Sequence, residues 1–312
     1  MMNNLCPVCG QSDVEVQGTY RGRHGAFGGL QRAHCRGCDL VFAAPMPSEA
    51  ALVDFNANYF DSAHGGQTQD RPAVAFFTGI ARLRSAHLER YLEARDAKVK
   101  TLLEVGPGPG YLARRWLERH PETTYLAMET DRSCHASLRE IGVRVLEGAS
   151  ADQGAGTVDL VVLSHVLEHI SDPGGFLKYS TRNLRQGGVL FIEVPCRDWE
   201  HKPLDEPHLL FFDKRPMRHL LDRLGFCEIQ VSYHGREIEQ LRSQSWLGAK
   251  WLGLRARLIA AGFVGPFGGA QPGMESLTSP LQRAVLAPYM AHVESAKPAW
   301  WLRALAVKRD VT

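Results

Sequence analysis

The strongest constraint on the fold is a regular alternation of short apolar runs with helical segments that begins near residue 100. Five runs are rich in Val, Ile and Leu, and they lie at 101–105, 124–128, 143–146, 158–163 and 189–194. Strands that are apolar over nearly their whole length are buried on both faces, as in a parallel sheet covered by helices. The pattern therefore predicts a doubly wound, mostly parallel α/β sheet, with ligands beyond the carboxyl ends of its strands.

Two further strand-like segments, 227–232 and 303–308, bring the expected number of strands to seven. Residues 46–98 and about 234–298 show helical periodicity without strand alternation. We therefore expect a seven-stranded Rossmann-like domain over residues 99–312, with a helical insertion at about 234–298. A helical cap or linker over residues 46–98 precedes it, and the two helical segments are expected to form lids.

Four cysteines near the N-terminus form two Cys-x-x-Cys pairs, Cys6 with Cys9 and Cys35 with Cys38. Residues 1–45 contain too little apolar material for an independent core, so a domain here needs another source of stability. The spacing is typical of two turns that close a tetrahedral thiolate site. Four thiolates saturate zinc, so the sequence predicts a zinc ribbon with a structural metal. A redox-active dithiol is the alternative.

Each Cys-x-x-Cys pair lies beside a glycine, Gly10 for the first pair and Gly37 for the second. A residue without Cβ lets the chain turn so that backbone amides face the thiolates. We expect both glycines to serve this purpose. His24 and His34 are alternative nitrogen ligands, although four sulfurs already complete the site.

A glycine-rich turn, Gly106-Pro107-Gly108-Pro109-Gly110, follows the first predicted strand. Glycines permit close approach of backbone to a ligand, and the following helix start offers unpaired amides. A dinucleotide fingerprint would have its third glycine where Tyr111 stands, which counts against NAD. The nearby Glu104 suits a ligand with cationic groups better than a pyrophosphate. Glu129, at the end of the next strand, is placed to accept both hydroxyls of a ribose.

Together with later segments, these motifs resemble the class I S-adenosylmethionine (SAM)-dependent methyltransferases. The matching segments are 104–110, Glu129, 159–170 with Ser164, His165, Glu168 and His169, and 187–195. The sequence is most similar to ubiquinone-type O-methyltransferases and to zinc-ribbon sugar methyltransferases. In the latter, a four-cysteine ribbon precedes the methyltransferase domain, as it does here.

The resemblance implies a SAM site with Glu104 near the methionine part of the cofactor and Glu129 on the ribose. The other cofactor-binding residues that it implies are Gly106, Pro107, Gly108, Gly110, Ala149, Ser150, Ser164 and His165. Residues 146–152 should flank the adenine. This segment departs from the family because the acidic residue usual after the third strand has no match in it.

Methyl transfer to a hydroxyl or carbon acceptor needs a base, and histidine is the commonest one. Related sugar methyltransferases carry Glu-His-Leu and then aromatic residues after the fifth strand, and His208-Leu209 matches this motif with Pro207 in place of the glutamate. We therefore expect His208 to be the general base, with Glu206 as its carboxylate. The alternative for His208 is a structural histidine that caps a helix or binds backbone. His165 is expected to shape the cofactor pocket. Further candidates for contact with the acceptor are Asp198 and His201.

The expected partner is a small-molecule acceptor: a saccharide, a nucleotide-linked sugar or a secondary-metabolite intermediate. With 36 Lys and Arg against 34 Asp and Glu, the chain lacks the strong positive charge of many nucleic-acid-binding proteins. An RNA methyltransferase that uses Arg21, Arg23 and Arg32 is the second hypothesis. A zinc-dependent interaction protein with a degenerate cofactor pocket is the third.

Residues 246–261 combine Trp and Leu with three basic residues. Such a segment is typical of a lid or subunit contact, and peripheral membrane contact is the alternative. No run of about 18 apolar residues predicts a transmembrane helix. The first 30 residues lack a secretory apolar region, so we expect a cytoplasmic protein. The sequence leaves the oligomeric state open.

Overall fold

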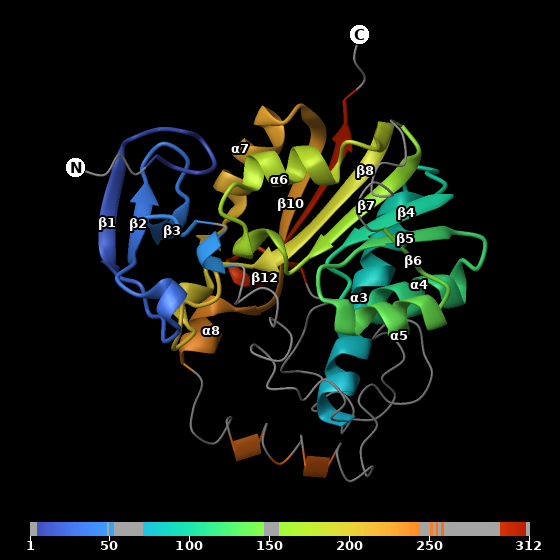
Figure 1. Cartoon of the computed structure of the whole chain (residues 1–312), viewed down its shortest axis with the longest axis horizontal. Helices are drawn as coiled ribbons and strands as arrows, with labels where there is room; N and C mark the ends of the chain where they lie inside the picture. Colours follow the sequence, from blue (N-terminus) through green and yellow to red (C-terminus); the bar gives the residue numbers. More distant parts are fainter. Residues whose placement is uncertain are drawn as a thin grey trace.

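The computed structural model describes residues 5–48, 50–52, 71–146, 156–243, 250, 251, 254, 257, 258 and 294–309. This part of the chain forms two sheets, a small one near the N-terminus and a large one flanked by helices (Figure 1). The carboxyl ends of the central strands of the large sheet lie toward the small sheet.

The large sheet has eight strands and is parallel through its central part. In spatial order the strands are β11 (Glu294–Ser295), β10 (Phe226–Glu237), β12 (Ala299–Lys308), β8 (Leu184–Pro195), β7 (Val158–Ser164), β4 (Thr101–Val105), β5 (Thr124–Met128) and β6 (Arg144–Val145). The five strands from β8 to β6 are parallel, and β12, β10 and β11 run antiparallel to their neighbours. All seven predicted strands are present, and the short β11 adds an eighth.

The strand order reverses beside β4, and this places the site. The chain runs outward from β4 through β5 to β6, then crosses to β7 on the other side of β4. Such a reversal opens a crevice at the carboxyl ends of the two neighbouring strands. The glycine loop follows β4, and residues 165–170 follow β7, so both predicted motifs meet at this crevice.

Helices cover both faces of the large sheet, as the apolar strands predict. The helices are α3 (Arg71–Glu93), α4 (Tyr111–Arg119), α5 (His135–Glu140), α6 (Pro173–Ser180), α7 (Lys214–Arg223) and α8 (Ile238–Arg242). Leu102 of β4 lies in one buried cluster with residues of α3, α4 and α5. The next residue, Leu103, lies in another cluster with residues of α6 and α7. Successive strand residues thus face opposite helical layers.

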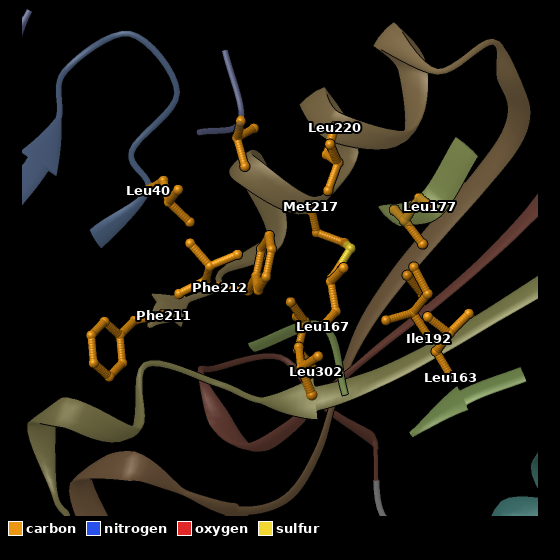
Figure 2. Close-up of a cluster of buried hydrophobic side chains, with 14 of the residues drawn as sticks. Leu40, Leu163, Leu167, Leu177, Ile192, Phe211, Phe212, Met217, Leu220 and Leu302 are labelled. Atoms are coloured by element: carbon orange, nitrogen blue, oxygen red, sulfur yellow. The ribbon is translucent and has the colours of Figure 1, made fainter. Parts of the chain in front are cut away.

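The small sheet has the order β1 (Val14–Thr19), β2 (Gln31–Cys35), β3 (Val41–Ala44) and β9 (Leu210–Phe211). The strand β9 comes from the segment between β8 and α7, and it pairs antiparallel with β3. Leu40 of the N-terminal part packs near Phe212, Met217 and Leu220 in one buried cluster (Figure 2). The division at residue 45 stays a prediction, and the two parts on either side of it share a sheet and a core.

Several predicted boundaries differ from the structure. The strand β8 begins at Leu184 instead of residue 189, because Leu184 pairs with Val158 of β7 before the register shifts. Residues 234–237 of the predicted insertion belong to β10. The strand β2 was not predicted, since Gln31, Arg32 and His34 give it a polar sequence.

Parts of two predicted segments lie outside the described residues. Of the helical segment expected at 46–98, residues 49 and 53–70 are not described, while residues 50–52 and 71–93 are helical. Of the segment 246–261 only five residues are described. In the part of the chain that the structure describes, none of the helices is both long and apolar enough to span a membrane.

Candidate active site and metal centre

The four N-terminal cysteines come together as the sequence predicts. Their sulfur atoms all lie within 4.8 Å of one another, with 3.5 Å between Cys6 and Cys38 and 3.3 Å between Cys9 and Cys35. None of them is in a disulfide. A tetrahedral zinc–thiolate site has sulfurs about 3.8 Å apart, so the cluster has the donor set and the size for one zinc ion.

The two cysteine turns use different residues for the same bend. Gly10 donates its N–H to Cys6 O and has φ of 73°, as predicted. In the second turn the corresponding residue is Asp39, which donates to Cys35 O and has φ of 65°. Gly37 is not among the residues with positive φ, and the side-chain amide of Gln11 packs over it. The expectation that Gly37 supplies the turn is therefore corrected to Asp39.

The glycine loop has the backbone that only glycine adopts easily. Gly106, Gly108 and Gly110 have φ of 70°, 55° and 83°. A Cβ on Gly106 would come within 2.6 Å of Val166 Cγ2, so the loop also needs glycine for space. Helix α4 starts directly after Gly110. A ligand can therefore approach the loop backbone closely.

Two glutamates flank this loop in different environments. Glu129 accepts hydrogen bonds from Gly108 N and Asp131 N, both at 2.8 Å. Glu104 is buried and accepts a hydrogen bond of 2.7 Å from Tyr125 Oη, and burial raises the pKa of its carboxyl to about 7. Glu129 is fixed against the loop, where a ribose can add its hydroxyls. Glu104 offers a buried group that a cationic ligand would favour in its ionised form.

The segment after β7 brings His165 between two buried carboxylates. Its Nδ1 lies 3.3 Å from Glu168 Oε1 and its Nε2 lies 3.5 Å from Glu193 Oε1. Burial alone would lower the pKa of His165, but the two carboxylates outweigh it and raise that pKa. Arg303 Nε binds Glu193 at 2.6 Å, and Arg84 Nε binds it at 3.1 Å. His165 is therefore fixed at the crevice by charge, with 37% of its side chain exposed.

His208 forms a close pair with Asp198, which the sequence analysis named only as an acceptor contact. Its Nδ1 lies 2.6 Å from Asp198 Oδ2, and Lys202 Nζ lies 2.9 Å from the same oxygen. Burial opposes ionisation of Asp198, but His208 and Lys202 prevail and hold the pKa of Asp198 well below its usual range. The carboxylate of Glu206 instead accepts hydrogen bonds from the backbone of Arg23 and His24. The carboxylate partner of His208 is thus Asp198 and not Glu206.

Glu168 is the unusual member of the site. Its side chain is 1% exposed, and neither carboxylate oxygen has a hydrogen-bond partner among the described residues. One ligand atom each from Glu168, His169 and His208 lie within 4.8 Å of one another. His169 Nδ1 lies 3.2 Å from Pro207 O, and burial lowers the pKa of His169 to about 4. This trio could accept a hydrogen-bond donor or a divalent cation.

The structure unites most of the predicted site at one crevice. A Cβ on Gly106 would meet the side chain of Val166, which directly follows His165, so the loop lies next to this segment. Leu209 N donates to Glu168 O at 2.7 Å. The cofactor loop and the His208 segment are thereby joined through residues 165–169. Ser164 is buried, and its hydroxyl has no partner among the described residues. Ala149 and Ser150 lie outside the described residues.

The sequence contains no local pattern that predicts the contacts of Asp198 and Glu193 in the site. Asp198 lies ten residues before His208, and only the conformation of the intervening loop brings the two together. Glu193 is one acidic residue inside an apolar strand, where its burial among arginines depends on distant elements.

Comparison with known proteins relates part of this chain to methyltransferases. Residues 78–231 match the family model of a methyltransferase domain. The ubiquinone biosynthesis O-methyltransferase of Caulobacter vibrioides is 34% identical over 102 residues, which cover 30% of this chain and 39% of that protein. A Mycobacterium tuberculosis protein named a "probable S-adenosylmethionine-dependent methyltransferase" is 25% identical over 190 residues, or 54% of this chain and 69% of that protein.

A solved structure with a similar course of chain is 1,6-didemethyltoxoflavin-N1-methyltransferase of Burkholderia thailandensis. It is 15% identical with a TM-score of 0.47, and the match covers 92% of this chain and 99% of that one. The chain matches less than half the length of the ubiquinone biosynthesis enzyme.

Proposed function

We propose that this protein is a SAM-dependent methyltransferase that acts on a small-molecule acceptor with His208 as general base. The match of residues 78–231 to a methyltransferase-domain family model supports the proposal. The acceptor class to test first is a saccharide or nucleotide-linked sugar, followed by secondary-metabolite intermediates. The observation that carries the proposal is the His208–Asp198 pair beside the buried carboxylate of Glu168, at the crevice that also holds the glycine loop.

The residues around the glycine loop fit SAM. The loop gives backbone access, Glu129 is oriented by two backbone amides, and Glu104 is buried beneath the loop. When bound, SAM supplies an electrophilic methyl group on a positively charged sulfur. Glu104 before the loop and Glu129 at the amide of Gly108 are two carboxylates that suit a ligand with an ammonium group and a ribose.

The His208–Asp198 pair has the geometry of a general base and its orienting group. Because Nδ1 faces Asp198 at 2.6 Å, Nε2 is the nitrogen left to take a proton from the acceptor. The ionised Asp198 stabilises the imidazolium that forms. Such proton transfer contributes about 10²–10⁴-fold to a rate, and alignment of the reacting groups contributes further.

Glu168 supports an acceptor that carries hydroxyl groups. Only imidazoles lie beside the buried carboxylate, with His165 Nδ1 3.3 Å from Oε1, and neither oxygen has a well-formed hydrogen bond among the described residues. An acceptor hydroxyl that donates to this carboxylate would lower the cost of its burial. Since Glu168 and His208 are neighbours, a compound with two nearby hydroxyls could donate to both. This is the arrangement that a sugar offers.

The first experiment separates cofactor binding from turnover. Calorimetry should show binding of SAM and of S-adenosylhomocysteine (SAH) to the wild type, and Gly108→Arg should abolish it because Gly108 has φ of 55° and lies on the loop. Absence of binding to the wild type would refute the proposal.

The second experiment identifies the class of acceptor. Methyl-labelled SAM is incubated with the protein and either a panel of nucleotide sugars or a cell extract, and the label should move to a small soluble compound. Transfer to RNA would favour the second hypothesis of the sequence analysis instead. Cofactor binding without transfer to any fraction would favour a degenerate pocket.

A further inference from the structure

The N-terminal part of the chain holds the backbone that carries His208. We call residues 5–44 the cysteine module and residues 205–211 the His208 segment. Asp205 N donates to Arg21 O at 2.9 Å, and Tyr20 Oη donates to His208 O at 2.9 Å in a buried contact. Directly after His208, Ala43 N donates to Leu209 O at 2.8 Å. The module thus binds the backbone on both sides of the histidine.

Asp205 is the main side-chain link between the two parts. Its side chain is fully buried, and it accepts hydrogen bonds from Arg21 N at 2.7 Å, Arg21 Nε at 3.1 Å and Arg32 Nη1 at 3.3 Å. His208 N in turn donates to Asp205 O at 3.0 Å. Loss of one partner from a buried ion pair is strongly destabilising, because a charge stays buried without compensation. The turn that leads into His208 therefore depends on two arginines of the module.

The residues that make these contacts are tied closely to the cysteine cluster. Arg32 and Cys35 lie on the same strand, β2, and Tyr20 and Arg21 directly follow β1, which pairs with β2. The cysteine turns are also held by α7: Arg223 Nη1 donates to Val8 O, and Arg215 Nη2 donates to Gly37 O at 3.0 Å. A metal that joins both turns would fix β2 and the start of the β1–β2 loop.

We infer that the cysteine module is a positioning element for His208, and that Asp205 is the positioning residue through which metal binding at the four cysteines orients this histidine toward Asp198. The inference rests on the proposed function for the role of His208. The module's hydrogen bonds described above go to residues 205–209 and to α7. The glycine loop and Glu104 lie instead at β4, and Glu129 follows β5. Metal loss should therefore disturb His208 and leave cofactor binding intact.

The test uses the full chain and needs no acceptor. Wild type with zinc is compared with the same protein after removal of zinc by a chelator, and with the variants Asp205→Asn and Tyr20→Phe. Amide hydrogen exchange is followed in the His208 segment and in residues 101–110. Proton NMR follows the Nδ1–H signal of His208, whose short bond to Asp198 should place it far downfield. Calorimetry measures the Kd of SAH.

Zinc removal and Asp205→Asn should each speed exchange in the His208 segment about tenfold or more and abolish the Nδ1–H signal, while the Kd of SAH stays within about threefold. Tyr20→Phe, which removes one hydroxyl and keeps the ring, should show the same effects more weakly. The control is Arg36→Ala, because Arg36 is in the module but pairs with the exposed Glu15. It should match the wild type in all three measurements.

Two results would overturn the inference. One is slow exchange and an intact Nδ1–H signal in the zinc-free protein. The other is loss of SAH binding in parallel with the loss of the signal, since this would mean general unfolding. Failure to find any methyl acceptor would instead count against the proposed function and would leave these measurements as they stand.

Discussion

Buried carboxylates at the crevice differ in their partners, and their chemistry differs accordingly. Glu193 lies against two arginines, and Asp198 lies against His208 and Lys202, so the pKa of each carboxyl is held low and both stay ionised. Glu104 accepts a hydrogen bond from the hydroxyl of Tyr125, and burial raises its pKa to about 7. A buried carboxyl group can thus be a fixed anion, as in Glu193, the partner of a base, as in Asp198, or a group that titrates near neutral pH, as in Glu104.

Glu104 should make cofactor affinity dependent on pH. Below its pKa of about 7 the carboxyl is protonated and cannot attract a cationic ligand, so SAM affinity should rise about tenfold between pH 6 and pH 8. Calorimetry at pH 6, 7 and 8 measures this change. Glu104→Gln should bind more weakly at pH 8 and show little change with pH. An equally steep rise in Glu104→Gln would assign the titration to another group.

Asp198 should control the proton transfer and not cofactor binding. Asp198→Asn cannot stabilise the imidazolium of His208 and should lower the rate of methyl transfer about 10²–10⁴-fold. The single-turnover rate with labelled SAM and the identified acceptor gives this number, and the Kd of SAH should not change. The matched variant is Glu206→Gln, which tests the carboxylate expected from the sequence. A large rate loss in Glu206→Gln alone would reverse the assignment.

At the scale of elements, the central strands and the glycine loop could be predicted because their residues respond to local constraints. The strands β4, β5 and β7 are apolar on both faces, and the loop must turn tightly between β4 and α4. Three glycines with positive φ then provide the bend. Apolar runs indicate buried strands and closely spaced glycines indicate a tight turn, so both features can be recognised within a short stretch of sequence.

The strand β2 and the His208–Asp198 pair could not be predicted, because local constraints do not decide them. The polar residues of β2 form a strand because β1 and β3 flank them, and Asp198 meets His208 because the cysteine module fixes the loop between them. Their positions follow from contacts between distant parts of the chain. No local pattern records such contacts.

The glycine loop permits a test that separates strain from steric conflict. Gly106→Ala faces both a positive φ of 70° and Val166 Cγ2 at 2.6 Å, whereas Gly142→Ala has φ of 86° with nothing within 4 Å of the new Cβ. Gly142→Ala should lower the free energy of unfolding by about 1–2 kcal/mol.

Gly106→Ala should cost more in stability than Gly142→Ala and should also weaken SAH binding. Denaturant titration and calorimetry measure the two effects. Equal losses of stability in both variants, with unchanged SAH affinity in Gly106→Ala, would show that the loop and Val166 can move apart.

At the scale of the whole molecule, the four cysteines join the two turns of a segment, residues 5–44, whose apolar side chains share a core with the rest of the chain. We expect one zinc ion per chain by elemental analysis, because one tetrahedral cluster of thiolates is present in the described residues. Cys35→Ser should lose the metal and lower the melting temperature. Cys134→Ser, which changes a buried cysteine outside the cluster, should keep it. Zinc-free wild type with an unchanged melting temperature would contradict a structural role.

A metal content of two ions per chain would indicate a second metal site. It would show that Glu168, His169 and His208 also hold a cation, and His208 would then be a ligand instead of a free base. Glu168→Gln would distinguish the two sites, since it should remove only the second ion.

The shared sheet has a consequence for how this protein can be divided or recombined. A cut after residue 45 would leave the edge of β9 open and would uncover Phe211 and Phe212, which are 1% and 0% exposed. An open edge beside uncovered aromatic rings is a site for aggregation. A chimera that exchanges the N-terminal part must therefore exchange residues 199–212 as well. These two segments are far apart in the sequence, but substitutions in one have to be matched by substitutions in the other.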